Sequence, residues 1–222
     1  MREIQSYLIT EKVASACIDA CTQLPDDVFK ALQDSKYSEK DSTAQGVLDE
    51  LILNAQIAAS DNVPICQDTG LTVIFVDLGQ DVHIKGSLLS DAINEGVRRG
   101  YKEGYLRKSI VSHPLDRKNT NDNTPAVIHT NIVSGDELTI WIVPKGGGCE
   151  NMSVAKVLKP SDGIEGVVKF VIDTVAAGGP NPCPPLIVGV GLGGTLEQAA
   201  ILSKKAILRQ IGSENPSNID SD

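Results

Sequence analysis

The stretch Pro64-Ile65-Cys66-Gln67-Asp68-Thr69-Gly70 stands directly before an apolar run from Leu71 to Leu78, which we expect to be a buried strand. Asp-Thr-Gly is typical of a turn, because Asp and Thr side chains hydrogen-bond to nearby backbone and Gly accepts a positive φ. Such a turn can direct one thiol and one carboxylate to a common point at the mouth of the strand. The alternative is a tight turn with a buried cysteine and a capping aspartate.

Length, charge and cysteine content limit the classes of protein. The 222 residues suffice for one large or two modest domains with a proper core. A net charge of −9 argues against a surface for nucleic acid or anionic membranes. No window reaches the length of a membrane span, and residues 1–13 lack a signal peptide, so we expect a cytoplasmic protein. The five cysteines then indicate metal binding, redox chemistry or burial, and not disulfides.

The first third of the chain predicts helices. Thr10 is expected to cap a helix that runs to about Cys21, with Val13, Cys17 and Cys21 on one face. Cys17 and Cys21 have the spacing for a metal, but two small buried thiols fit better, because no histidine or second thiol pair lies nearby in the sequence.

Two more helices are expected before the Cys66 stretch. A short one follows Pro25, and a longer one starts at a capping box made by Ser42 and Gln45 and stops at Pro64. The apolar stripe of the longer helix consists of Val47, Leu48, Leu51, Ile52, Ala55 and Ala59.

The middle of the chain alternates between strand and helix patterns. After the expected strand at 71–78, a turn at 79–81 leads to a helix that opens at Ser90 or Asp91 and runs to about Glu103. Residues 116–124 are expected to be loop, and strands are expected at 126–130 and 138–143.

The last third has a βα rhythm. A helix follows Ser161, a strand is expected over 186–190, and a glycine-rich turn leads to a helix that ends at about Ile211, before a polar tail. The apolar face of the first of these helices consists of Ile164, Val167, Val168, Val171, Ile172 and Val175.

These patterns together predict an α/β fold, in which N-terminal helices pack on a mixed sheet whose loops carry the glycine and cysteine motifs. We expect one catalytic domain over 1–222, with a helical part over about 1–62, a sheet-containing part over about 63–211 and a polar tail over 212–222.

Two glycine motifs suggest ligand contacts. Gly189, Gly191 and Gly194 match G-x-G-x-x-G, which indicates a dinucleotide site, an anion site at a helix N-terminus, or glycines that let a helix pack closely. The run 146–148 suits close approach of a carboxylate or phosphate; the alternative is a flexible connector.

Cys66 and Cys183 each lie in a loop stiffened by proline, which is unusual for packing alone. Thiolate ligation of iron would explain both, but it normally needs more than two cysteines, so Cys149 or a further ligand has to be considered. Arg107 and Arg117 are candidates for bidentate binding of a dicarboxylate, with a solvated surface role as the alternative for each.

The chain resembles the alpha subunit of two-subunit class I fumarases and L(+)-tartrate dehydratases, which are iron–sulfur hydro-lyases. The resemblance covers about residues 5 to 211. Its motifs are Pro-Ile-Cys-Gln-Asp-Thr-Gly at 64–70, Gly-Tyr-Leu-Arg-Lys-Ser at 104–109, Asn-Thr-Pro-Ala at 123–126, Lys-Gly-Gly-Gly-Cys-Glu-Asn-Met-Ser at 145–153, and Asn-Pro-Cys-Pro-Pro with Val-Gly-Val-Gly-Leu-Gly-Gly-Thr at 181–195.

The resemblance implies a 4Fe-4S cluster held by three cysteines, whose open iron acts as a Lewis acid. Cys66 and Cys183 match two of the ligands. The third lies in a later segment of the family, so we expect it beyond the end of this chain, which looks truncated. Cys149 stands where relatives usually carry Ser or Ala, and is an alternative third ligand.

The resemblance also assigns substrate contacts. Gln67 and Asp68 would touch the substrate, with Asp68 as a candidate proton-transfer residue. Arg107 would bind a substrate carboxylate, and Gly147 and Gly148 would line the pocket.

The expected function is reversible hydration of a small C4 dicarboxylate, fumarate to malate, in a homo- or hetero-oligomer in which a beta subunit completes the site. The alternative within the family is L(+)-tartrate dehydratase. Alternatives of another class are a nucleotide-binding module and an inactive truncated scaffold subunit. No nucleic acid or membrane partner is expected.

Overall fold

The computed structural model describes residues 1–215 of the chain. The chain divides into two compact units, an N-terminal unit (Met1–Gly147) and a C-terminal unit that starts at Gly148. The single catalytic domain expected over residues 1–222 stays a prediction.

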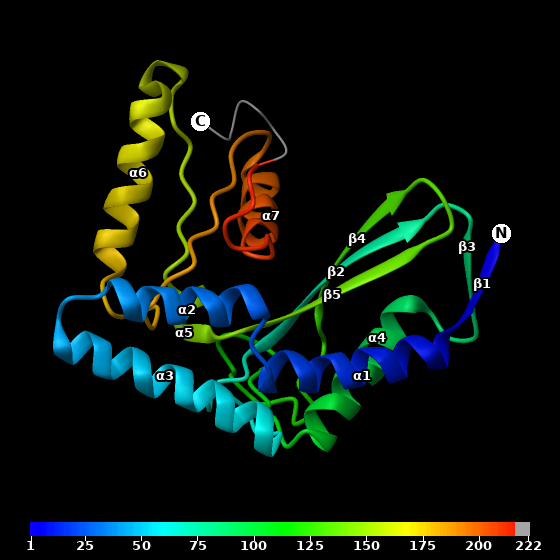
Figure 1. Ribbon diagram of the computed structural model, residues 1–222. Helices are drawn as coiled ribbons and strands as arrows, with labels where there is room; N and C mark the ends of the chain where they lie inside the picture. The colour runs from blue at the N-terminus through cyan, green and yellow to red at the C-terminus, as the bar shows by residue number, and fades with distance from the viewer. Residues whose placement is uncertain (216–222) are drawn as a thin grey trace. The chain divides into compact units, whose positions relative to one another are not determined.

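The N-terminal unit contains three helices before its main sheet and one helix inside the strand sequence (Figure 1). Its elements are β1 (Arg2–Gln5), α1 (Ser6–Thr22), α2 (Asp26–Ser38), α3 (Ser42–Asp61), β2 (Leu71–Gly79), β3 (Val82–Lys85), α4 (Leu89–Glu103), β4 (Val127–Val133) and β5 (Leu138–Lys145). The main sheet has the order β4-β2-β5, with β4 parallel and β5 antiparallel to β2, and a parallel pair joins β1 to β3. The predicted α/β fold with a mixed sheet is confirmed.

Strand β2 is the centre of the main sheet because its sequence is apolar on both faces. Val73, Ile74, Phe75 and Val76 are consecutive and all buried. A strand with one face in water alternates apolar and polar residues, whereas a continuous apolar run suits a strand that is covered on both sides. The strand predicted over 71–78 is therefore confirmed, and its start fixes the position of the Cys66 loop.

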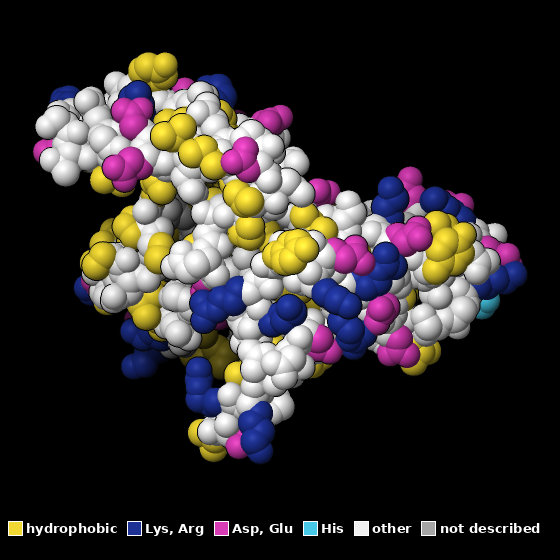
Figure 2. Space-filling view, turned by 90° about the horizontal axis from the view of Figure 1, so that it is seen from below, with side chains coloured by type: hydrophobic (Ala, Val, Ile, Leu, Met, Phe, Trp, Pro, Cys, Tyr) yellow, Lys and Arg dark blue, Asp and Glu magenta, His cyan; other side chains and the backbone are white. Residues whose placement is uncertain are grey.

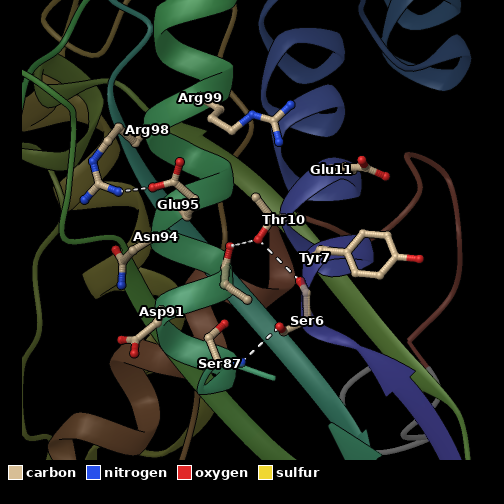
Figure 3. A pocket seen from close by; sticks show the side chains of 11 residues that line it. Ser6, Tyr7, Thr10, Glu11, Ser87, Asp91, Asn94, Glu95, Arg98 and Arg99 are labelled. Carbon is tan, nitrogen blue, oxygen red and sulfur yellow. Dashed lines mark hydrogen bonds and ion pairs between the residues drawn. The ribbon is translucent and has the colours of Figure 1, made fainter. Parts of the chain in front are cut away.

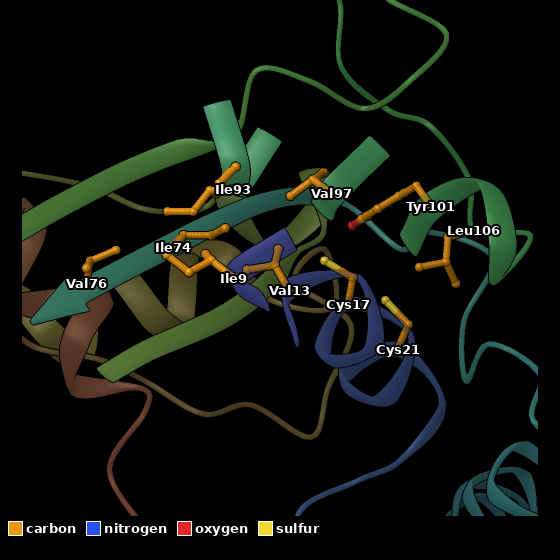
Figure 4. Packing of buried hydrophobic residues seen from close by; sticks show 11 residues of the cluster. Ile9, Val13, Cys17, Cys21, Ile74, Val76, Ile93, Val97, Tyr101 and Leu106 are labelled. Atoms are coloured by element: carbon orange, nitrogen blue, oxygen red, sulfur yellow. The ribbon is translucent and has the colours of Figure 1, made fainter. Parts of the chain in front are cut away.

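The core lies where α1 and α4 pack together beside the sheet (Figure 4). Cys17 and Cys21 of α1 point into this core with Val13, and burial raises the pKa of both thiols to about 12. Both thiols therefore stay protonated near neutral pH, and the prediction that they are buried packing residues is confirmed.

Two glycines of α4 allow the close approach of α1. A Cβ atom on Gly96 would lie 2.6 Å from Val13 Cβ, and one on Gly100 would lie 2.6 Å from the carbonyl oxygen of Ala14. These distances are shorter than any normal contact, so only glycine fits at this helix crossing.

The predicted start of the first helix is wrong. Thr10 lies inside α1, and its hydroxyl donates to the carbonyl oxygens of Ser6 (3.3 Å) and Ala92 (3.0 Å). A threonine inside a helix can bond back to the carbonyl four residues earlier, which makes it a poor marker of the helix start.

The predicted cap of α3 is also wrong by one residue. Asp41, and not Ser42, is the N-cap, and its Oδ1 accepts from the backbone N–H groups of Thr43 and Ala44, at 2.9 Å each. Aspartate and serine cap about equally well, so the sequence alone could not choose between neighbours. At the other end, Asn62 adopts a left-handed φ of 54° before Pro64.

The C-terminal unit contains η1 (Pro160–Asp162), α6 (Gly163–Gly178) and α7 (Leu196–Ala206), and the one-turn helix α5 (Gly147–Glu150) begins at the junction of the two units. The predicted helices after Ser161 and after the glycine turn are present, although α7 ends at Ala206 and not at about Ile211. The polar tail falls largely in residues 216–222, outside the described part of the chain.

The strand predicted over residues 186–190 is not formed in the described structure. This segment runs against α7 instead: a Cβ on Gly189 would lie 2.1 Å from the carbonyl oxygen of Ser203, and one on Gly191 would lie 2.1 Å from that of Ala199. An apolar β-branched segment forms a strand only where a partner strand supplies hydrogen bonds, and the sequence pattern does not report the partner.

No helix in the described part of the chain is both long and apolar enough to cross a membrane.

Gly100→Ala tests the packing of α1 on α4. We expect a loss of about 1–3 kcal/mol in the free energy of unfolding, because the new methyl group overlaps Ala14 and Cys17. Gly46→Ala in α3 is the matched control, because a Cβ there meets nothing within 4 Å, and it should stabilise by about 0.5–1 kcal/mol. Urea unfolding of both variants measures the difference; equal stabilisation by both substitutions would contradict the packing argument.

Candidate functional site

The loop that carries Cys66 is anchored to two helices. The backbone N–H of Ile65 donates to the carbonyl oxygen of Cys21 at the end of α1 (2.9 Å), and the side chain of Asn54 in α3 donates to the carbonyl oxygen of Ile65 (2.8 Å). The backbone N–H and the carbonyl oxygen of Ile65 are therefore both hydrogen-bonded, which places the next residue, Cys66, at a defined position.

Gly70 brings this loop against the end of β5. Its φ is +68°, and a Cβ would lie 2.4 Å from the carbonyl carbon and oxygen of Lys145 and 2.8 Å from the N of Gly146. Only glycine combines this conformation with this contact. The close approach places the Asp-Thr-Gly turn beside the first residues of the glycine run at 146–148.

Asp68 joins the two loops with its carboxylate. Oδ1 accepts from the N–H of Gly70 (3.1 Å), and Oδ2 accepts from the N–H of Gly147 (3.0 Å). The predicted turn chemistry of Asp-Thr-Gly is thus confirmed. A carboxylate oxygen has two lone pairs, so each oxygen keeps one for a further donor, while the orientation of the group is fixed.

The thiol of Cys66 is exposed, so the alternative of a buried cysteine in this turn is wrong. Its Sγ accepts from the backbone N–H of Asp68 and donates to Oε1 of Gln67, both at 3.4 Å. The amide of Gln67 lies beside the same sulfur.

Arg107 is tied to the Asp-Thr-Gly turn through its backbone. The hydroxyl of Thr69 donates to the carbonyl oxygen of Arg107 (3.0 Å), and the hydroxyl of Tyr101 donates to the carbonyl oxygens of Thr69 (2.8 Å) and Gly70 (3.3 Å). Tyr101 is fully buried, and burial raises its pKa, so it donates as a neutral phenol. Arg107 itself is exposed, which leaves its guanidinium free to bind an anion.

Asn123 is the residue at this site that sequence reasoning missed. It is fully buried with a left-handed φ of 60°, and its Oδ1 accepts from the backbone N–H groups of Ser109 (2.7 Å) and Ile110 (3.2 Å). Its Nδ2 donates to the carbonyl oxygen of Gly70 (3.2 Å). The only signal was its place in the Asn-Thr-Pro-Ala motif, because polar character in a loop normally indicates exposure.

The C-terminal unit carries the other predicted site residues. Cys183 is exposed and has a left-handed φ of 61° between two prolines, and its N–H donates to the carbonyl oxygen of Pro180 (3.2 Å). Cys149 is also exposed, and its Sγ donates to the carbonyl oxygen of Pro182 at 3.0 Å. A Cβ on Gly148 would lie 3.6 Å from the carbonyl oxygen of Asn181, so α5 and the loop at 181–183 are neighbours.

The structure therefore gathers the predicted residues in two groups, one in each unit. The group in the N-terminal unit consists of Cys66, Gln67, Asp68, Arg107 and Gly147; the group in the C-terminal unit consists of Gly148 and Cys183. Among the described residues, neither group contains three metal-ligating side chains in one place.

The glycines of the G-x-G-x-x-G motif have a packing role. Gly189 and Gly191 are the residues that approach the backbone of α7, and they follow no strand. A dinucleotide fingerprint needs a strand before its glycine turn. The packing alternative thus accounts for Gly189 and Gly191 without a nucleotide.

A separate hollow of about 570 Å³ lies between α1 and α4, lined in part by Thr10, Glu95, Arg98 and Arg99 (Figure 3). It shares no residue with the loops described above. Arg98 pairs with Glu95 and with Asp122 (3.0 Å), and Arg99 pairs with Glu103 (3.3 Å). These cations are already neutralised, so the hollow does not suit an anionic substrate. Acidic and basic side chains likewise lie next to each other on the face in Figure 2.

An exposed thiol, a fixed carboxylate and an exposed guanidinium on adjacent loops of an α/β unit are typical of an enzyme that binds an anionic substrate at a loop-built site. The chain belongs to the fumarate hydratase family, whose sequence profile, described as Fumarate hydratase (Fumerase), matches residues 10–222. This is a family of iron–sulfur-dependent hydro-lyases.

The chain is similar to proteins named as tartrate dehydratase subunits. It is 40% identical over 210 residues, which are 92% of this chain and 73% of the relative, to the "Putative L(+)-tartrate dehydratase subunit alpha" of Methanocaldococcus jannaschii. It is 39% identical over 212 residues, 94% of this chain and 69% of the relative, to the L(+)-tartrate dehydratase subunit alpha of Escherichia coli K12. The predicted resemblance is confirmed.

Asn123→Gly tests the support of the site loops. We expect a loss of about 2–4 kcal/mol in the free energy of unfolding, because two N–H groups and one carbonyl lose a buried partner. Asn121→Gly is the matched control, since Asn121 also has a left-handed φ of 66° but is exposed, and its change should stay within about 1 kcal/mol. Urea unfolding distinguishes the two, and equal losses would refute a special role of the Asn123 amide.

Proposed function

We propose that this chain is the alpha subunit of an iron–sulfur hydro-lyase that adds water to, or removes it from, a C4 dicarboxylate. The relatives of about 40% identity carry the name L(+)-tartrate dehydratase subunit alpha. The names of these relatives support dehydration of L(+)-tartrate to oxaloacetate better than hydration of fumarate.

The observation that carries the proposal is the hydrogen-bonded group formed by Cys66, Asp68 and the backbone of Arg107. These residues come from loops almost forty positions apart, and the Asp-Thr-Gly turn joins them. A merely structural turn would not need an exposed sulfur and an exposed cation beside it.

The thiols suit an iron–sulfur cluster in their chemistry. Cys66 and Cys183 are free and exposed, each sits in a loop of restricted conformation, and the sulfur of Cys66 already accepts a backbone N–H. We assign these two as ligands of one 4Fe-4S cluster. Two thiols are fewer than the usual set, so the assignment requires at least one further ligand. When bound, the cluster supplies an open iron that acts as a Lewis acid toward a substrate hydroxyl and carboxylate.

Arg107 is proposed to bind a substrate carboxylate. Its backbone is fixed by Thr69 and its guanidinium is exposed, so the side chain offers a planar pair of donors from a fixed base. Gly147 leaves room for this substrate, because a Cβ at this position would meet nothing within 4 Å. Its N–H already donates to the carboxylate of Asp68. Gly148, the next residue, is proposed to line the same pocket.

Asp68 and Gln67 are proposed to act at the reacting carbon atoms. The carboxylate of Asp68 keeps one free lone pair on each oxygen and is held in one orientation, as a proton acceptor must be. The amide of Gln67 can donate to a substrate oxygen through its Nε2, since its Oε1 already accepts from Cys66. A beta subunit is proposed to complete the site, as the name of the relatives implies.

Cys66→Ser tests the cluster assignment. We expect the full chain, produced with the beta subunit and reconstituted without oxygen, to lose the visible cluster absorbance and the dehydration of L(+)-tartrate. Wild-type protein should act on L(+)-tartrate more efficiently than on L-malate, measured as kcat/KM. Retention of both absorbance and activity by Cys66→Ser would refute the proposed function, and a preference for L-malate would restore the fumarate hydratase assignment.

Arg107→Lys tests carboxylate binding. A lysine keeps the charge but not the paired geometry, so we expect KM to rise about ten- to a hundredfold with a smaller change in kcat. Arg117→Lys is the matched control, because Arg117 is an exposed arginine in the following polar loop, and its KM should stay within about twofold. Steady-state kinetics of both variants decide between a binding role and a general effect of charge.

A further inference from the structure

Two exposed thiols of the C-terminal unit lie on neighbouring segments, Cys149 in the one-turn helix α5 and Cys183 in the loop at 181–183. Cys149 Sγ is 3.0 Å from the carbonyl oxygen of Pro182, the residue that precedes Cys183. A peptide oxygen lies roughly 3 Å from the next Cα atom, so Cys149 Sγ is within roughly 6 Å of Cys183 Cα. A disulfide needs the two sulfurs about 2 Å apart and the two Cβ atoms about 4 Å apart, so a movement of a few ångströms that turns the two side chains toward each other would allow the bond.

The segment of Cys149 is the one better able to make this movement. Cys149 lies in the one-turn helix α5 directly after three consecutive glycines, whose backbone has the widest conformational freedom. Cys183, by contrast, is fixed by prolines on both sides and by its N–H bond to Pro180. One adaptable thiol beside one fixed thiol, both in reach of solvent, is the arrangement that thiol–disulfide exchange requires.

We propose that Cys149 and Cys183 form a reversible disulfide. With a small disulfide such as oxidised glutathione as oxidant, one cysteine thiolate attacks a glutathione sulfur, forms a mixed disulfide and releases one glutathione thiolate. The second cysteine thiolate then attacks the protein sulfur of the mixed disulfide and releases the other glutathione. The two cysteines lose two electrons and two protons in total, and the oxidant becomes two thiols.

The consequence rests on the proposed function, in which Cys183 is a cluster ligand. A sulfur in a disulfide cannot bind iron as a thiolate. Oxidation of the pair would therefore hold the cluster-free chain in a form that cannot load a cluster, while reduction would return Cys183 to the ligand set.

The test uses the reduced, cluster-free full chain, treated with oxidised glutathione and digested with trypsin without reduction. We expect the peptides 146–156 and 170–204, which contain Cys149 and Cys183, to be linked. The free thiols should fall from five to two, because the exposed Cys66 takes up one glutathione. Cys149→Ser should give no linked peptides and should keep one glutathione on Cys183. Cys66→Ser is the matched control and should still give the linked pair, and Cys17 and Cys21 should stay unmodified because they are buried.

The outcomes separate this proposal from the proposed function. Separate glutathione adducts on Cys149 and Cys183 in the wild-type chain, or a link from either of them to Cys66, would overturn the pair. Linked peptides in a chain that takes up no iron and sulfide after reduction would keep the pair and refute the cluster. Cluster loading that is blocked by oxidation and regained with dithiothreitol is the result expected from both proposals.

Discussion

The carbonyl group of Gly70 is the point on which the candidate site depends. It accepts from two fully buried donors, Tyr101 of α4 and Asn123 of the loop before β4. A buried carbonyl that lost these partners would cost free energy, so the turn is held where the helix and the loop place their side chains. The same two residues also hold Thr69 and the 109–110 backbone, so a single buried network positions the loops of Cys66 and Arg107.

Much of the fold could be read from the sequence because its signals are local. The continuous apolar run at β2 predicts a central strand, and the four-residue spacing of Val13, Cys17 and Cys21 predicts the buried face of α1. Helix starts were less accurate, since Thr10 and Ser42 have cap chemistry but a neighbouring residue or an interior position uses it otherwise. The segment at 186–190 has the composition of a strand, yet strand formation depends on a partner elsewhere in the chain.

The candidate site, like the fold, could be predicted from the sequence only in part. Turn chemistry around Asp68 and the need for glycine at position 70 follow from residue type, and the structure confirms both. The role of Asn123 could not be predicted, because its three hydrogen bonds reach residues 13 to 53 positions away. The glycines at 189 and 191 show the reverse case: a motif that suggests a ligand is explained by the close approach of a helix.

The carboxylate of Asp68 has a structural role in addition to any chemical one, because it accepts hydrogen bonds from two backbone N–H groups. An amide at position 68 would turn an N–H toward Gly70 or toward Gly147, where the carboxylate now accepts from both. Replacing Asp68 would therefore loosen the contact between the glycine run at 146–148 and the Asp-Thr-Gly turn, and it would also remove the proposed proton acceptor. Kinetic losses at this position would combine altered architecture with lost proton transfer, and a pH–rate profile would be needed to tell the two contributions apart.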